Sequence, residues 1–108
     1  MALLECPYLG KRVELTGERR EHILLRHPDL LPEHFDEIAK TLKDPDDVRK
    51  DDRFPATQLF SRWCEHLKGG KWIVVAVISD PPPAERSWVV TAYIARKLAK
   101  GTSEWTRD

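Results

Sequence analysis

The most strongly apolar stretch of the chain is 71–79, which is apolar throughout between its two polar end residues. Successive side chains of a strand point to opposite faces, so an uninterrupted apolar run predicts a strand buried on both faces, in the middle of a sheet. The next apolar stretch, 87–95, has one fully apolar face, whereas Thr91 and Tyr93 lie on its other face. We expect any chemical site to lie on the face that carries these hydroxyl groups.

Turn residues mark further strands around this central one. Residues 57 to about 65 alternate between the two faces, and Gly69-Gly70 is typical of a hairpin into the central strand. Three successive prolines at 81–83 make a stiff loop that returns the chain antiparallel. Residues 47–50 could form a short first strand. The pattern therefore predicts an antiparallel meander of three to four strands.

Two helices are predicted before the meander. The first runs from residue 17 to about 26, because the Thr16 hydroxyl can accept a free backbone N–H of the first turn, and Pro28 disfavours the helical conformation at the residue before it. The second, at about 32–42, opens with a proline in its first turn. Its apolar stripe faces the core and consists of Phe35, Ile38, Ala39 and Leu42.

These elements predict an α+β fold in which two N-terminal helices pack on one face of an antiparallel β-meander of three to four strands. A chain of 108 residues is expected to form a single domain, with a core at about 13–97 and a polar tail at 101–108. Residues 11–15 could add a short edge strand.

Composition narrows the classes of function. The chain has 18 basic and 18 acidic residues, so no overall charge draws it to nucleic acid or to an anionic membrane. Its two cysteines, Cys6 and Cys64, stand in no zinc-ligand spacing, as is usual in a reduced cytosolic protein, and Cys64 is expected to be a small packed residue. No glycine-rich phosphate loop, signal peptide or membrane span is recognisable. We therefore expect a cytoplasmic protein without a cofactor or a bound metal.

Several short motifs occur in a characteristic order along the chain. They are Leu15-Thr16, Arg20-Glu21-His22-Ile23, Arg26-His27-Pro28-Asp29, Thr41-Leu42 with Asp44-Pro45-Asp46, and Val90-Thr91-Ala92-Tyr93. In this order they resemble the phage and bacterial members of the barnase, EndoU, colicin E5/D and RelE superfamily, the BECR nucleases. The resemblance extends over about 13–97.

The resemblance implies a small α+β fold, with an antiparallel sheet packed under N-terminal helices. In many members of the superfamily the exposed sheet face cleaves RNA without a metal. The matching positions in this chain would be His22, Arg26 and His27 on the first helix, and Thr91 and Tyr93 on the last strand.

The residue types at these positions suit that chemistry. Cleavage of RNA without a metal needs a base for the ribose 2′-OH, an acid for the leaving 5′-oxygen, and cations or donors for the phosphorane. Histidine suits either proton-transfer role near neutral pH, so His22 and His27 are the candidate acid and base. Arg26 could bind a phosphate through two hydrogen bonds, and Thr91 and Tyr93 could donate to the developing charge.

Helical spacing distinguishes the two histidines. At 100° per residue, His27 lies on the side of Arg20, at the margin of the apolar face, whereas His22 lies with Arg19 and Arg26. His27 is therefore the better candidate to reach the sheet, and His22 the better candidate to meet a phosphate from the solvent side. As structural alternatives, His27 could cap the helix C-terminus and His22 could be a solvated surface residue.

Further basic residues are weaker candidates for substrate binding. The stretch 86–100 contains basic residues and no acid, so Arg96 and Lys97 could receive RNA phosphates. Arg62 could contribute from the preceding strand, with a surface ion pair as its structural alternative. His34 and His66 are expected to be surface residues.

Two functions remain open. The first is a metal-independent endoribonuclease, toxin-like, that acts on RNA and is paired with a cognate antitoxin or another protein partner. The second is a non-catalytic module of the same fold that binds a protein or a small ligand through the open sheet face. In the second case Thr91 and Tyr93 are simply good strand formers. The zero net charge favours the second function, and histidines close to strand hydroxyls favour the first.

Overall fold

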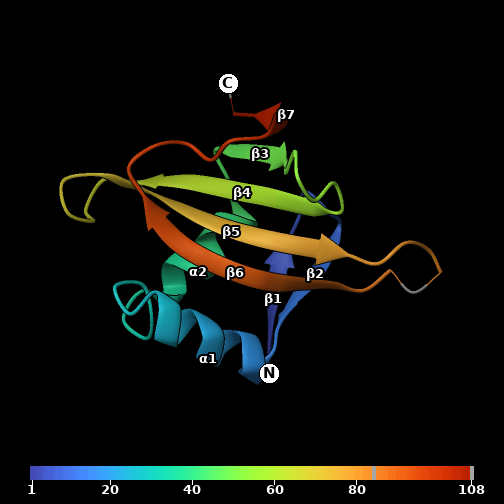
Figure 1. The fold of residues 1–108 in the computed structure, drawn as a ribbon, viewed down its shortest axis with the longest axis horizontal. Coiled ribbons are helices and arrows are strands. Elements are labelled where there is room, and N and C mark those ends of the chain that lie inside the picture. Colours follow the sequence, from blue (N-terminus) through green and yellow to red (C-terminus); the bar gives the residue numbers. More distant parts are fainter. Residues whose placement is uncertain (84, 108) are drawn as a thin grey trace.

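The computed structural model describes residues 1–83 and 85–107, which form one mixed sheet and two helices (Figure 1). The sheet has seven strands within these ranges, in the order β1-β2-β6-β5-β4-β3-β7. The strands are β1 (Ala2–Cys6), β2 (Lys11–Leu15), β3 (Asp47–Lys50), β4 (Thr57–Cys64), β5 (Lys71–Ser79), β6 (Ser87–Ala95) and β7 (Thr102–Thr106). The helices are α1 (Gly17–Arg26) and α2 (Phe35–Lys43). β2 and β6 run parallel, and the other neighbouring strands run antiparallel.

The prediction of two N-terminal helices on a meander of three to four strands is wrong, because the hairpin β1–β2 precedes α1. Pro7 and Gly10 interrupt the regular strand pattern of the chain because they belong to a tight turn between β1 and β2. The Leu9 N–H donates to the Cys6 carbonyl over 3.1 Å, the Gly10 N–H donates to the Pro7 carbonyl over 3.0 Å, and Gly10 has a φ of 70°. The turn lets β1 pair with β2 along its whole length, so both strands join the sheet.

Within the expected polar tail, residues 102–106 form β7 on the far edge of the sheet. All five residues of β7 are exposed, so the sequence shows no alternation of apolar and polar residues that would predict this strand. The chain reaches β3 through Gly101, whose φ is 138° and where a Cβ atom would lie 2.4 Å from the Lys50 carbonyl oxygen. Only glycine fits this approach, and β7 then pairs with β3 by backbone hydrogen bonds.

The first helix follows its local signals more closely than the second. α1 has the predicted bounds and the predicted N-cap, since the Arg19 N–H donates to the Thr16 hydroxyl over 3.2 Å. α2 begins at Phe35 rather than at Pro32, because turns occupy 28–34. Within the described ranges, neither helix has the length and apolar character that a membrane span requires.

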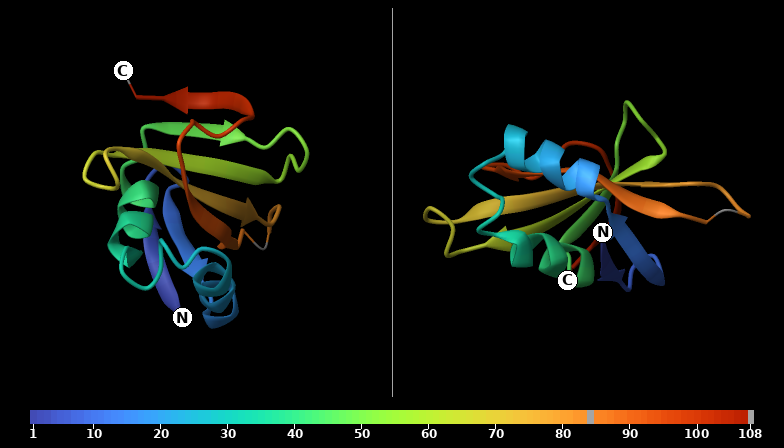
Figure 2. Two further views of the ribbon diagram at one scale, coloured as in Figure 1. Left: turned by 60° about the vertical axis from the view of Figure 1, so that its left-hand side comes forward. Right: turned by 90° about the horizontal axis from the view of Figure 1, so that it is seen from below.

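Two apolar clusters lie on the two faces of the central strands. The larger cluster packs Ile73, Val75 and Val77 of β5 against α2 and the β1–β2 hairpin. α2 lies behind the sheet, whereas α1 runs alongside β6, so the two helices do not cover one face together as predicted (Figure 2). The smaller cluster includes Val74 and Ala76 of β5, which confirms that β5 is buried on both faces.

The sheet face that carries the smaller cluster is called the open face below. Strand register places Leu59, Ala76 and Thr91 side by side across it, and it pairs Val74 with Tyr93. The hydroxyl-bearing residues of β6 therefore lie on this face, with α1 along one border and the β3–β4 loop along the other (Figure 1).

Candidate functional site

The C-terminus of α1 meets the open face at Tyr93. His27 is the C-cap residue of α1, and its backbone N–H donates to the Ile23 carbonyl over 2.7 Å. Its ring centroid lies 5.9 Å from that of Tyr93, with the two ring planes 39° apart. The capping role and the contact with the sheet therefore occur together, and the structure places His27 beside Tyr93, as the helical spacing predicts.

A second side chain of α1 reaches β6. Arg19 Nη1 donates to the Val90 carbonyl over 3.2 Å. Arg19 thus shares the sheet-facing side of the helix with Ile23 and His27, at intervals of four residues. The sequence-based grouping of Arg19 with the solvent side was wrong. Arg20 instead lies with its guanidinium 5.1 Å from the centre of the Phe35 ring.

Thr91 lies beside a pocket on the open face. The pocket has a volume of about 610 Å³, and its walls come from the β3–β4 loop, β5 and β6. The lining is mostly apolar and includes Phe54, whose side chain is 60% exposed. The Thr91 hydroxyl oxygen is buried and has no hydrogen-bond partner among the described residues. Since buried hydroxyls are nearly always paired, this oxygen is a candidate contact for a ligand.

A second hollow of about 380 Å³ continues from this pocket toward Tyr93. It shares Asp51 and Arg53 with the first pocket and is also lined by Lys100. Burial, together with the negative charge of Asp51, raises the pKa of the Tyr93 phenol. Tyr93 is therefore a protonated hydrogen-bond donor at neutral pH. The two hollows together offer the hydroxyl groups of Thr91 and Tyr93 and exposed cations on one surface, and His27 contacts the Tyr93 ring.

The remaining predicted residues lie outside this group. His22 is half-buried and Arg26 is exposed on α1, and in the part of the chain that the structure describes neither has a hydrogen bond or ring contact with β6. Arg96 and Lys97 are exposed just after β6. Arg62 lies on the α2 side of the sheet and contacts Glu37, so it does not face the pocket at Thr91.

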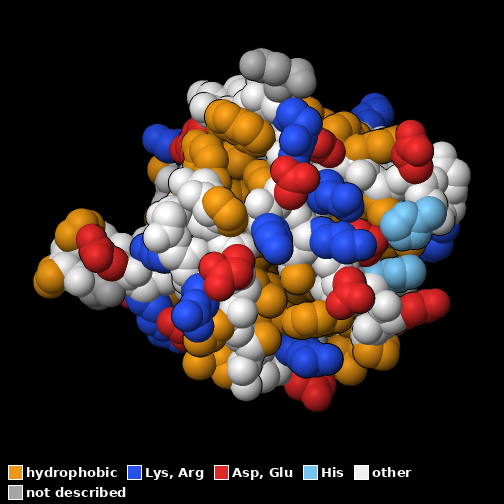
Figure 3. All heavy atoms as spheres, turned by 180° about the vertical axis from the view of Figure 1, so that it is seen from behind, with side chains coloured by type: hydrophobic (Ala, Val, Ile, Leu, Met, Phe, Trp, Pro, Cys, Tyr) orange, Lys and Arg blue, Asp and Glu red, His pale blue; other side chains and the backbone are white. Residues whose placement is uncertain are grey.

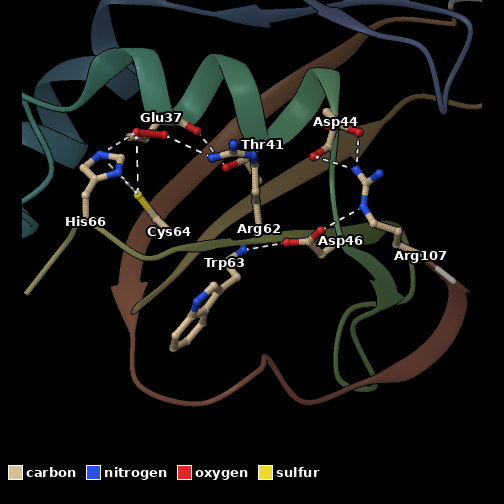
Figure 4. A network of polar contacts seen from close by, with 9 residues as sticks. All are labelled: Glu37, Thr41, Asp44, Asp46, Arg62, Trp63, Cys64, His66 and Arg107. Atoms are coloured by element: carbon tan, nitrogen blue, oxygen red, sulfur yellow. Dashed lines mark hydrogen bonds and ion pairs between the residues drawn. The ribbon is translucent and has the colours of Figure 1, made fainter. Parts of the chain in front are cut away.

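A different polar cluster lies on that α2 side (Figure 4). Glu37 is 4% exposed, and its Oε2 lies 3.2 Å from His66 Nε2 and 3.7 Å from Cys64 Sγ. Both ring nitrogens of His66 lie 3.4 Å from Cys64 Sγ. Burial and the nearby charge of Glu37 raise the pKa of the Cys64 thiol, so the sulfur is protonated at neutral pH. The three side chains form one group, called the Glu37 cluster below.

Sequence reasoning missed this cluster. Cys64 was expected to be only a packed residue and His66 only a surface residue, and Glu37 lies next to the apolar stripe of α2 without belonging to it. The one signal along the chain is the spacing of Cys64 and His66, two residues apart at the end of a strand. Seen from behind, acidic and basic side chains are interspersed on this side of the molecule, so no patch of one charge marks it either (Figure 3).

Comparisons with known proteins found no matching family model, no similar curated protein and no similar solved structure. The resemblance to BECR nucleases therefore remains a hypothesis that depends on the motifs named above.

Proposed function

We propose that the protein is a metal-independent endoribonuclease whose site lies on the open face around His27, Thr91 and Tyr93. The observation that carries the proposal is the contact of His27 with Tyr93, which lines the smaller hollow next to the pocket that Thr91 lines. These three residues come from a helix and a strand far apart in the sequence. A histidine beside two donors is the minimum that proton transfer at a phosphate requires.

The pocket has a size and lining that suit a nucleotide. Ligand pockets commonly have volumes of about 300–1,000 Å³, and the hollow of about 610 Å³ lies within this range. Phe54 at its wall could stack on a base, as aromatic side chains do in proteins that bind single strands. Arg53 and Lys100 lie close enough to the open face to bind phosphates next to the scissile one.

In the proposed reaction the ribose 2′-oxygen attacks phosphorus and the bond from phosphorus to the 5′-oxygen breaks. His27 accepts the 2′-OH proton, and the protonated Tyr93 phenol is the candidate donor to the leaving 5′-oxygen. Arg19 and the Thr91 hydroxyl would stabilise the negative charge of the phosphorane. The products are a 2′,3′-cyclic phosphate and a free 5′-hydroxyl.

The test is cleavage of labelled single-stranded RNA and of tRNA in excess EDTA. The expected result is a 2′,3′-cyclic phosphate product from wild type that His27→Ala, Tyr93→Phe and Thr91→Ala reduce. His34→Ala is the matched control, since His34 lies at the start of α2 and pairs with Glu33. Equal cleavage by wild type and His27→Ala would contradict the proposed site.

A second candidate function is a binding module on the same face. It is favoured by the apolar lining of the pocket at Thr91 and by the zero net charge of the chain. If folded wild type cleaves no RNA but Thr91→Trp abolishes binding of a small apolar ligand, this second function replaces the first.

A further inference from the structure

We propose that Glu37, Cys64 and His66 bind a Zn²⁺ ion on the α2 side of the sheet, with a fourth coordination position open to solvent. This inference concerns a face other than that of the proposed RNA site and does not depend on it. It also departs from the expectation, drawn from cysteine spacing alone, that the chain has no zinc site. The ligand set combines α2, the end of β4 and the turn that follows β4.

The distances within the Glu37 cluster match a zinc site. Zinc bonds of about 2.0–2.3 Å in a tetrahedron place neighbouring ligand atoms about 3.3–3.6 Å apart. The observed separations are 3.4 Å from Cys64 Sγ to His66 Nε2, 3.2 Å from His66 Nε2 to Glu37 Oε2, and 3.7 Å from Cys64 Sγ to Glu37 Oε2. The three ligand atoms therefore lie close to the corners of one face of a tetrahedron, and an ion could occupy the centre of that tetrahedron with little movement of the side chains.

The backbone holds two of the ligands firmly. Cys64 is the last residue of β4 and is 2% exposed, and Glu37 is in the first turn of α2. His66 sits in the turn after β4, where the buried Leu67 donates its N–H to the Cys64 carbonyl over 3.4 Å. Only the His66 side chain is largely exposed, at 68%, so it can adjust to the ion.

Arg62 orients the carboxylate of Glu37. Its Nη1 lies 3.2 Å from Glu37 Oε1, which leaves Oε2 directed toward the cysteine and the histidine (Figure 4). Such partners of a ligating carboxylate commonly raise metal affinity by fixing its geometry. The carboxylate of Glu37 and the thiolate of Cys64 would neutralise the two positive charges of the ion. The occupied site would therefore carry no net positive charge that repels Arg62.

The types of ligand favour zinc over harder ions. Mg²⁺ and Ca²⁺ prefer oxygen ligands, whereas one sulfur, one nitrogen and one oxygen suit Zn²⁺. The cluster opens into a hollow of about 340 Å³ that Lys40 and Asp46 also line. Asp46 is already engaged, since its carboxylate accepts from the Trp63 N–H and from Arg107. We therefore assign the fourth position to water.

The test uses the full chain, freed of metal with EDTA and dialysed, and then titrated with Zn²⁺ or Co²⁺ alone. The expected result is one ion per chain and, with Co²⁺, a thiolate charge-transfer band with the strong visible bands of tetrahedral cobalt. Cys64→Ala should abolish the charge-transfer band, and His66→Gln should weaken Zn²⁺ binding at least about tenfold. Cys6→Ala is the matched control for the thiol and His34→Gln for the imidazole, and both should bind as wild type does.

Two results would overturn the proposal. One is the absence of the charge-transfer band in wild type. The other is Zn²⁺ binding of equal strength by wild type and His66→Gln, which would mean an adventitious ion only. Because the His66 side chain is largely exposed, His66→Gln should fold normally, and circular dichroism without metal checks this. If wild type cleaves no RNA in excess EDTA, that result concerns the proposed site on the open face. It does not affect the zinc titration, which tests the α2 side of the sheet.

Discussion

The imidazole of His27 lies against the phenol ring of Tyr93, with the ring centroids 5.9 Å apart. This contact ties the C-terminus of α1 to the open face of the sheet, where Tyr93 lines the hollow next to the pocket at Thr91. Because His27 is the C-cap residue of α1 and its backbone N–H donates to the Ile23 carbonyl, the backbone position from which its ring projects is fixed. The relationship gives the proposed nuclease its sharpest test.

We expect His27→Ala to lower the rate of RNA cleavage by about 10²–10⁴-fold, the range that general acid–base groups contribute. Tyr93→Phe keeps the ring against His27 and removes only the hydroxyl, so it should lower the rate while leaving the thermal midpoint nearly unchanged. The measurement is single-turnover cleavage of labelled RNA, with unfolding followed by circular dichroism. A Tyr93→Phe chain that cleaves at the wild-type rate would remove the phenol from the mechanism.

The ionisation of Tyr93 gives a prediction that does not depend on activity. Burial and the charge of Asp51 raise its pKa above the value of free tyrosine, about 10. The folded state therefore holds the phenol proton more tightly than the unfolded state. The stability that this proton contributes is fully present below about pH 10 and is lost as the pH rises through the folded-state pKa.

The measurement is an alkaline titration of tyrosinate absorbance in Tyr8→Phe, in which Tyr93 is the only tyrosine left. Asp51→Asn in the same background should lower the midpoint, because one of the two causes of the raised pKa is removed. A Tyr93 that titrates at or below the midpoint of a free tyrosine would show that the ring is solvated and that Asp51 does not act on it.

Local signals predicted the centre of the molecule well. The apolar run at 71–79 gave β5 with its observed bounds and its burial on both faces, and Thr16 with Pro28 gave the bounds of α1. In each case the information lies within a few residues: a period of two, a cap, or a proline. The contact of His27 with Tyr93 could be predicted for the same reason, because each residue lies on a predictable face of its own element.

The parts that failed depend on distant partners. β7 is exposed at every residue and exists because its backbone finds β3, and β1 exists because a tight turn returns it to β2. β7 has no apolar pattern in the sequence, and in β1 the buried residues Leu4 and Cys6 alternate with exposed ones over only five residues. The Glu37 cluster was missed for a related reason. A glutamate on a helix is usually solvated, and only the approach of α2 to the end of β4 buries Glu37 beside Cys64.

The glycine that leads into β7 should be irreplaceable. In Gly101→Ala the new Cβ would meet the Lys50 carbonyl oxygen at 2.4 Å, with a backbone φ of 138° that alanine rarely adopts. We expect a loss of about 1–3 kcal/mol in the free energy of unfolding, the usual size of such backbone strain. Amide hydrogen exchange should become faster in β3 and β7 and stay slow in β5.

Gly17→Ala is the matched control for that substitution. Gly17 opens α1, and a Cβ atom there would meet nothing within 4 Å. It should leave stability unchanged or raise it by up to about 1 kcal/mol, because alanine has less conformational freedom to lose in the unfolded chain. Equal unfolding midpoints for Gly101→Ala and wild type would mean that β7 is not held at the sheet edge in solution.

Zinc should stabilise the fold if the Glu37 cluster binds it. An ion that binds only the folded state contributes about 2.7 kcal/mol to the free energy of unfolding at a concentration of about 100 times its dissociation constant. For a chain of this size, that corresponds to a rise of roughly 10 °C in the unfolding midpoint.

The rise in the midpoint is measured by thermal unfolding of the metal-free chain with added Zn²⁺, and with Mg²⁺ as the control ion. The rise should be specific to Zn²⁺, should disappear in Cys64→Ala and should persist in Cys6→Ala, since Cys6 is buried in β1 and does not belong to the group of ligand atoms. An equal rise in both cysteine variants would place the zinc elsewhere and leave the Glu37 cluster as a carboxylate–imidazole contact beside a packed thiol.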